Sequence, residues 1–264
     1  MHQPRKRFAQ HFLHDAAIID RIVATIRPEP GQSMVEIGPG LGALTGPLLA
    51  RLGQLQAVEI DRDAIRHLQQ RYPPSVLQIH QADVLRFQFG SLPGAGTLRL
   101  AGNLPYNIST PLLFHLLQQR EHILDMHFML QKEVVDRMAA AAGDAAYGRL
   151  SVMLAPWCRV EPLFEIGPGA FRPPPRVVSR FVRLLPYAQS ALAIDHHPDF
   201  AAVVSAAFSQ RRKTLRNALR QLLSEAQILA AGIDPAARAE VIAPTGFAAL
   251  ANVLGAARTN PQPS

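Results

Sequence analysis

The chain has 264 residues, of which 48% are hydrophobic and 18% charged, a composition typical of a folded protein and unlike that of a disordered one. Its 27 Lys and Arg exceed its 20 Asp and Glu, and the net charge of +7 favours a polyanionic partner such as nucleic acid. The single cysteine, Cys158, excludes an intrachain disulfide and a zinc site built from cysteines. No apolar run is long enough for a membrane span and no secretory signal is recognisable, so we expect a cytoplasmic protein.

The first half of the chain alternates between short apolar runs and helical patterns. In chain order we expect a helix between Asp15 and Ile26, a strand at 34–37, a helix at 44–52, a strand at 55–60, a helix at 61–72, strands at 76–80 and 98–101, a helix at 110–119, a strand at 124–130 and a helix at 131–142. Strands that alternate with helices in this way predict βαβ units and a doubly wound, mostly parallel sheet.

The pattern changes further along the chain. Residues 159–166 and 177–184 are β-like, and we expect them to add an antiparallel edge to the sheet. The composition shifts after Leu185, and residues 198–264 carry only helical patterns. We therefore predict an α/β domain over residues 1–187, including a basic N-terminal lead, and a small all-α domain over residues 188–264.

A glycine-rich turn, Glu36-Ile-Gly-Pro-Gly-Leu-Gly-Ala43, joins the first predicted strand to a helix. Gly38, Gly40 and Ala43 satisfy the loose G-x-G-x-x-G/A pattern of dinucleotide sites. Glu59 closes the next strand about 20 residues later, where an acid can bind ribose hydroxyls. These residues predict a cofactor that contains adenosine and leave its identity open. Asp83 follows the third strand at the same edge, where a carboxylate can accept a hydrogen bond from an adenine amino group.

The segment Asn103-Leu104-Pro105-Tyr106 follows the fourth strand and reaches the same edge of the sheet. The Asn103 side chain and a backbone carbonyl of the turn can together accept both hydrogens of an exocyclic amino group. Pro105 stiffens the turn, and Tyr106 offers an aromatic face on which a flipped base can stack. The segment therefore predicts chemistry at the amino group of a base.

The glycine turn, Glu59, Asp83 and the Asn103–Tyr106 segment, in this order, resemble the S-adenosylmethionine-dependent adenine-N6 methyltransferases. Longer stretches narrow the resemblance to the bacterial small-subunit (16S) ribosomal RNA adenine N6,N6-dimethyltransferase family, over nearly the whole chain. These stretches are 5–13, 102–111, 129–135, 147–151, 171–175 and 208–217.

The resemblance implies a seven-stranded methyltransferase sheet and the dimethylation of two adjacent adenosines near the 3′ end of 16S ribosomal RNA. It also implies S-adenosylmethionine as the cofactor and a set of residues that contact it. The glycine pattern adds Gly40 to that set. One departure is His11, which stands where the family usually has Asn. The implied contacts are His11, Leu13, Gly38, Glu59, Asp83 and Asn103.

The mechanism that we expect is a direct in-line transfer that needs no metal site and no covalent enzyme intermediate. Hydrogen bonds from adenine N6 to Asn103 and to a turn carbonyl would hold the nitrogen against the activated methyl group. Tyr106 is the candidate for one face of the base, and Phe171 for the other.

Basic residues predict the RNA contacts. Arg212, Arg216 and Arg220 recur every four residues, and we expect them on one face of a helix, flanked by Arg211 and Lys213. Arg5, Lys6 and Arg7 at the start of the chain are further candidates. The expected partner is 16S ribosomal RNA within the small subunit or its precursor, and we expect the protein to be a monomer.

Three alternatives remain open from the sequence. An adenine-N6 methyltransferase of large-subunit ribosomal RNA or of DNA would share the Asn103–Tyr106 chemistry. A nicotinamide-dependent oxidoreductase would use the glycine pattern but leaves that segment unexplained. A non-catalytic RNA-binding factor for ribosome assembly or transcription would retain the fold without turnover.

Overall fold

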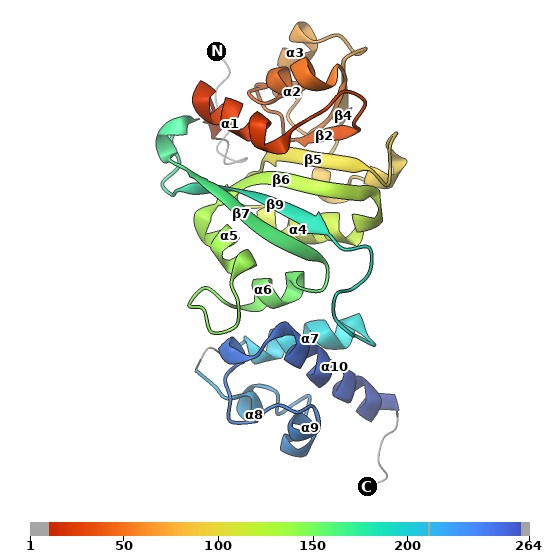
Figure 1. Cartoon of the computed structure of the whole chain (residues 1–264), viewed down its shortest axis with the longest axis vertical. Coiled ribbons are helices and arrows are strands. Elements are labelled where there is room, and N and C mark those ends of the chain that lie inside the picture. Colours follow the sequence, from red (N-terminus) through yellow and green to blue (C-terminus); the bar gives the residue numbers. More distant parts are fainter. Residues whose placement is uncertain (1–10, 211, 260–264) are drawn as a thin grey trace. The chain divides into compact units, whose positions relative to one another are not determined.

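The computed structural model describes residues 11–210 and 212–259, which fold as two compact units (Figure 1). Within these residues, the first unit comprises 11–135 and 160–186, and the second comprises 136–159 and 187–259. This division differs from the single boundary expected between residues 187 and 188. The difference arises because residues 136–159 pack with the helical second unit.

A seven-stranded sheet forms the centre of the first unit, in the order β4-β3-β2-β5-β6-β9-β7. Strands β2 to β6 pair in parallel, and β9 runs antiparallel to β6, so the expected mostly parallel sheet with an antiparallel edge is confirmed. The strands are β2 (Met34–Ile37), β3 (Leu55–Glu59), β4 (Leu77–Gln81), β5 (Leu98–Asn103), β6 (Ile123–Gln131), β7 (Cys158–Ile166) and β9 (Ser179–Pro186).

The strand order reverses at β2, which has β3 on one side and β5 on the other. In open α/β sheets, ligands bind beyond the carboxyl ends of the strands at such a reversal. The glycine turn follows β2, Glu59 ends β3 and Asn103 ends β5, so the predicted site residues meet at this point.

Helices connect the parallel strands, and their ends follow local sequence signals. Asp15 caps α1 by accepting a hydrogen bond from Ile18 N at 3.1 Å, and Asp61 caps α3 through Asp63 N at 2.9 Å. Ile22, Leu48 and Leu68 bury the apolar faces of α1, α2 and α3 in one core cluster. The elements are α1 (Ala16–Ile26), α2 (Thr45–Leu52), α3 (Arg62–Arg71), α4 (Ser109–Gln118) and α5 (Lys132–Ala139), with 3₁₀ turns η2 (Val84–Arg86), η3 (Phe89–Ser91), η4 (Arg120–His122) and η5 (Pro168–Ala170).

A second, two-stranded sheet pairs β1 (Phe12–Leu13) with β8 (Phe171–Arg172) in antiparallel fashion. Phe12 lies opposite Arg172, and Leu13 lies opposite Phe171. Strands of two residues carry no alternation, so no sequence pattern predicts them. The pairing brings the segment before α1 against the proline-rich segment that precedes β9.

The second unit is helical, as expected. Its core joins Tyr147 and Val152 to Phe200 and Phe247, and the Tyr147 hydroxyl donates a hydrogen bond to Ile242 O at 2.8 Å. These contacts explain why residues 136–159 belong to this unit. Its helices are α6 (Arg149–Leu154), α7 (His197–Ala207), α8 (Leu215–Ala218), α9 (Glu225–Ala230), η6 (Ala239–Val241) and α10 (Pro244–Thr259). In neither unit do the described residues form a helix of the length and hydropathy needed to span a membrane.

Candidate active site

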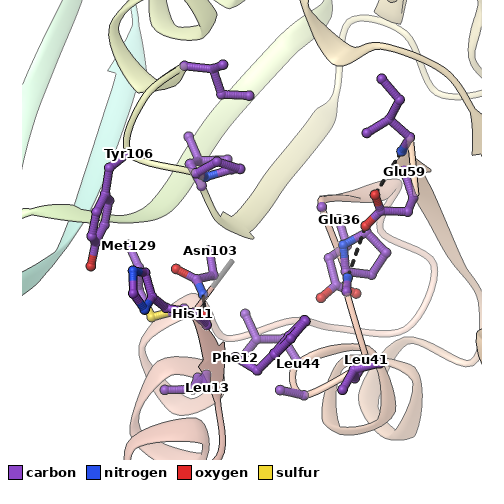
Figure 2. A pocket seen from close by; sticks show the side chains of 18 of the residues that line it. His11, Phe12, Leu13, Glu36, Leu41, Leu44, Glu59, Asn103, Tyr106 and Met129 are labelled. Atoms are coloured by element: carbon purple, nitrogen blue, oxygen red, sulfur yellow. Dashed lines mark hydrogen bonds between the residues drawn. The ribbon is translucent and has the colours of Figure 1, made fainter. Parts of the chain in front are cut away.

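A cavity opens at the carboxyl ends of β2, β3 and β5, and β1 forms one of its walls. Figure 2 shows Glu59 on one side of this cavity and Asn103 with Tyr106 on the other, with Phe12 between them. Nine of the predicted site residues therefore line one space. They are His11, Leu13, Gly38, Gly40, Glu59, Asn103, Leu104, Pro105 and Tyr106.

The glycine turn has a backbone that side chains disfavour. Gly38, Gly40 and Gly42 have φ values of 65°, 55° and 85°, in the left-handed region. A Cβ on Gly40 would stand 3.2 Å from the Phe12 ring, so glycine also lets β1 close over the turn. The sequence needs glycine here for both reasons, and the turn gives a ligand access to backbone atoms.

Glu59 is fixed by three backbone amides. Its Oε2 accepts from Gly40 N at 3.1 Å, and its Oε1 accepts from Ile60 N at 2.8 Å and from Asp61 N at 2.9 Å. Burial raises its pKa, and these hydrogen bonds oppose the rise. The carboxyl is thus held rigidly at the end of β3 with acceptor capacity left for ribose hydroxyls.

A second carboxyl, Glu36, lines the same cavity and was not among the predicted site residues. It is 2% exposed on β2, and the Thr45 hydroxyl donates a hydrogen bond to its Oε2 at 2.6 Å. Burial, reinforced by repulsion from Glu59, raises its pKa to about 7. The sequence signal that could have identified Glu36 is its position at the start of the glycine-rich motif, near the carboxyl end of β2. Two acidic groups in one cavity favour a ligand that carries positive charge.

The Asn103 side chain is oriented by His11, the residue before β1. Its Nδ2 donates a hydrogen bond to His11 O at 2.8 Å, and because a carbonyl can only accept, this contact fixes the amide orientation. The Oδ1 atom has no protein partner among the described residues and is therefore available to accept a hydrogen bond from a ligand. His11 contributes its backbone oxygen here, so this contact does not involve the His11 side chain.

The turn after Asn103 leaves one further carbonyl available. Pro105 O accepts from Ile108 N at 3.2 Å, and Tyr106 O accepts from Ser109 Oγ at 3.0 Å. No donor within the described residues reaches Leu104 O. Asn103 Oδ1 and Leu104 O are therefore two acceptors without protein partners among the described residues, in the segment where the sequence analysis expected acceptors for an amino group.

Tyr106 forms the outer wall beside these acceptors. Its hydroxyl lies 2.7 Å from Ser179 Oγ, and its ring stacks near His11, with the ring centroids 5.9 Å apart. Burial raises the pKa of the Tyr106 hydroxyl, so the group stays protonated at neutral pH. The hydrogen bond of its hydroxyl thus fixes the Tyr106 ring, as stacking of a flat ligand on the ring requires.

Gly102 explains how the acceptors come so close to the glycine turn. A Cβ at this position would stand 2.3 Å from Ile37 O on β2, a distance that no side chain tolerates. Glycine therefore permits the close pairing of β5 with β2 just before Asn103. The sequence analysis quoted this glycine only within a longer stretch.

Two predicted residues lie elsewhere. Asp83 is exposed, does not line the cavity, and caps η2 by accepting a hydrogen bond from Leu85 N at 3.0 Å. Phe171 is 1% exposed and belongs to the core cluster with Phe164 and Phe181, because its place in β8 turns its ring into the core. The structure thus corrects the expectation that Phe171 offers a face to the base, and it gives Asp83 a capping contact.

The structure also corrects the expectation that the basic residues share one face of a helix. Helix α7 ends at Ala207 and α8 has only four residues, so Arg212, Arg216 and Arg220 do not share one helical face. All three and Lys213 are exposed, and Arg216 pairs with Glu225 at 3.5 Å. The other basic candidates lie outside the described residues: Arg5, Lys6, Arg7 and Arg211.

The sequence analysis also passed over apolar residues of the cavity. Phe12, Leu44 and Met129 line it, and no pattern separates them from core residues. The glycine turn, the acid at the end of β3 and the two available acceptors at the end of β5 meet at one edge of an α/β sheet, as in an α/β methyltransferase that acts on an amino group.

Comparison with known proteins identifies the family. A family model described as "Ribosomal RNA adenine dimethylase" matches residues 1–255. A protein of Methylobacillus flagellatus named "Ribosomal RNA small subunit methyltransferase A" is 54% identical over 97% of this chain and 99% of its own length. A protein of the same name from Thiobacillus denitrificans is 53% identical over 96% of this chain and 99% of its own length. The chain therefore belongs to the ribosomal RNA adenine dimethylase family, as its motifs indicated.

Solved structures agree with this assignment. The crystal structure of a dimethyladenosine transferase from Plasmodium falciparum is similar with a TM-score of 0.78 and 25% identity, over 93% of this chain and 98% of that one. The crystal structure of the 23S rRNA methyltransferase ErmE has the same fold, with a TM-score of 0.71 and 24% identity over 92% of this chain and 99% of that one. The fold alone thus leaves the RNA substrate open, whereas sequence identity favours the small subunit.

Proposed function

We propose that this protein transfers methyl groups from S-adenosylmethionine to N6 of two adjacent adenosines near the 3′ end of 16S ribosomal RNA, giving N6,N6-dimethyladenosine. The observation that carries the proposal is the pair of amino-group acceptors, Asn103 Oδ1 and Leu104 O, set beside the Tyr106 ring. The full-length similarity to small-subunit methyltransferases supports the choice of RNA.

The cavity fits S-adenosylmethionine in its chemistry. Glu59 is held where ribose hydroxyls can reach it, and the glycine turn leaves room for the adenosine part. Glu36 lies on β2, between the strand that ends in Glu59 and the strand that ends in Asn103. The Glu36 carboxyl would therefore lie near the cationic part of a cofactor bound across the ends of β3, β2 and β5. When bound, S-adenosylmethionine supplies a methyl group that is already activated for transfer.

The residues of this chain then position the nucleophile. Asn103 Oδ1 and Leu104 O accept the two N6 hydrogens and so direct the nitrogen lone pair, which is otherwise delocalised into the ring, toward the methyl group. Tyr106 supports one face of the adenine, and the apolar lining from Phe12 and Leu44 excludes water. Catalysis here consists of positioning and electrostatic stabilisation, without a proton relay from a side chain.

We further propose that the protein acts as a monomer in the cytoplasm, on the small subunit or its precursor. The exposed basic residues of the second unit, Arg212, Lys213, Arg216 and Arg220, support contact with RNA phosphates. We retain Asp83 as a candidate cofactor contact through its second carboxylate oxygen, although its Oδ1 serves η2.

The test is methyl transfer from labelled S-adenosylmethionine to small subunits that lack the modification, followed by mass spectrometry of the digested RNA. We expect dimethyladenosine at two adjacent positions of 16S RNA and no transfer to 23S RNA or DNA. Label in 23S RNA or DNA alone would assign the large subunit or DNA as substrate. Cofactor binding without transfer to any nucleic acid would favour a non-catalytic RNA-binding factor.

A further inference from the structure

The segment 172–178 runs from the last residue of β8 to the start of β9 at the edge of the active site, and the proposed reaction gives it no task. We propose that this segment grips the RNA strand beside the target adenosine, with Arg172 and Arg176 binding its phosphates. The inference rests on the proposed function, because it assigns part of the RNA contact of that same site.

Two contacts tie the segment to residues that line the active site, and a third ties it to the start of α5. The His11 Nδ1 donates a hydrogen bond to Pro173 O at 2.7 Å, and Ser179 Oγ lies 2.7 Å from the Tyr106 hydroxyl at the other end. Between them, Lys132 N donates to Val178 O at 2.9 Å. The segment is therefore tied to the residue that orients Asn103 and to the ring proposed to support the base.

The sequence of the segment makes it stiff and leaves it few backbone donors. Pro173, Pro174 and Pro175 have fixed φ angles and no N–H groups, so little conformational entropy is lost when a ligand binds. Pro175 is buried, whereas Pro173 and Pro174 are exposed. The segment thus presents a preformed surface, which suits recognition of a strand by shape.

The charges of the segment are not used inside the protein. Arg172 and Arg176 are both exposed, and neither forms an ion pair within the described residues. The next arginines on this stretch behave differently, because Arg180 binds Glu165 at 2.5 Å and Arg183 binds Asp125 at 3.1 Å. The two arginines of the segment are therefore left available to an anion.

Phosphate is the anion that these features favour. A guanidinium binds phosphate through paired N–H groups, and the strand that delivers an adenosine to Asn103 must bring its flanking phosphates to this rim. Val177 is 42% exposed beside Arg176 and offers apolar contact to a sugar or base. A clamp of this kind would hold the strand while the target base enters the cavity.

The test compares Arg176→Ala with Arg51→Ala, an exposed arginine in the last turn of α2. Loss of one phosphate contact reduces the slope of log affinity against log salt by about 0.7, which corresponds to roughly fivefold weaker RNA binding at about 0.1 M salt. We expect this loss for Arg176→Ala, a larger one for the double variant with Arg172→Ala, and recovery of the salt slope with Arg176→Lys. KM for the RNA should rise, while kcat and KM for S-adenosylmethionine stay unchanged.

Equal RNA affinity and salt slope for Arg176→Ala and Arg51→Ala would overturn the proposal. A fall in kcat without a change in RNA affinity would overturn it as well, because it would show that the segment shapes the active site and does not bind the RNA. Binding is measured separately from turnover, so the comparison still decides the matter if the wild-type protein fails to methylate 16S RNA. That failure would count against the proposed function alone.

Discussion

Replacing Asn103 by alanine removes two contacts with different roles. The Nδ2 contact, 2.8 Å from His11 O, orients the side chain and joins the residue before β1 to the end of β5. The Oδ1 atom is the proposed acceptor for the adenine amino group. The first contact belongs to the folded protein and the second forms only with substrate, so stability and turnover should respond to the substitution by different amounts.

The magnitudes can be estimated separately. Loss of one partly buried hydrogen bond costs about 1 kcal/mol of folding free energy, with about as much again for the unpaired His11 carbonyl. Loss of an oriented group that acts in the transition state costs roughly 10²- to 10³-fold in rate, or about 3–4 kcal/mol of barrier. We therefore expect a folded protein that binds S-adenosylmethionine and has lost nearly all turnover.

The assay is single-turnover methylation of small subunits with saturating cofactor, together with urea unfolding of each variant. Asn107→Ala is the matched control, because Asn107 also lines the cavity but is exposed and makes no hydrogen bond in the described residues. It should retain its rate within a few fold. Methyl transfer by folded Asn103→Ala at a near-normal rate would refute the role given to the side chain.

Asn103→Asp sharpens the test. A carboxylate keeps an acceptor near the amino group but cannot donate to His11 O, and it places two acceptors against each other. We expect the rate to fall and the fold to lose more stability than in the alanine variant. A fully active aspartate variant would show that the orientation set by His11 is dispensable.

Four further predictions test the site and the frame around it. Burial raises the pKa of Glu36 from 4.5 to about 7, so its protonated carboxyl stabilises the fold fully below pH 4.5, and this stabilisation is lost as pH rises through 7. Glu36→Gln should therefore remove about 3 kcal/mol of the pH dependence of the unfolding free energy, measured by urea unfolding without cofactor. Phe171→Ala should destabilise the protein by about 3–5 kcal/mol, since its ring is fully buried, whereas a loss of activity at unchanged stability would restore it as a base-stacking residue. Asp125→Ala should cost about 3–5 kcal/mol, because it leaves the buried Arg99 guanidinium, 2.9 Å away, without its carboxylate. Gly102→Ala should reduce both stability and turnover, because its Cβ must displace Ile37 O, and an unchanged melting temperature would contradict the close pairing of β5 with β2.

The strands and the cavity were predictable because their signals are local. Each parallel strand is a short apolar run that ends at a polar or glycine-rich turn, and parallel strands bring all these ends to one edge. The order Gly38, Glu59, Asn103 along the chain therefore already implied that the three would meet. Their separation across the sheet did not follow from chain order, because β5 comes after β4 in the chain but pairs with β2.

What could not be predicted depends on partners distant in the chain. Phe171 was expected in the site because an aromatic residue before a proline run suits a base, but its pairing with Leu13 across β1 and β8 turns it into the core. Tyr147 belongs to the second unit because of a hydrogen bond to Ile242, 95 residues away. The arginine spacing of four predicted a helix, but that helix ends at Ala207, before Arg212 is reached.

The same limit applies to atoms within correctly predicted residues. The sequence supplies an Asn, but whether its oxygen or its nitrogen faces a ligand depends on His11, 92 residues away in the chain. The turn supplies three carbonyls, and Ile108 and Ser109 bind two of them, which leaves that of Leu104. Residue identity therefore predicts which groups a site contains, whereas the hydrogen bonds already made inside the protein decide which atoms remain for the substrate. By this argument, variants at His11 that shift its backbone should reduce turnover even though the His11 side chain itself contacts Pro173.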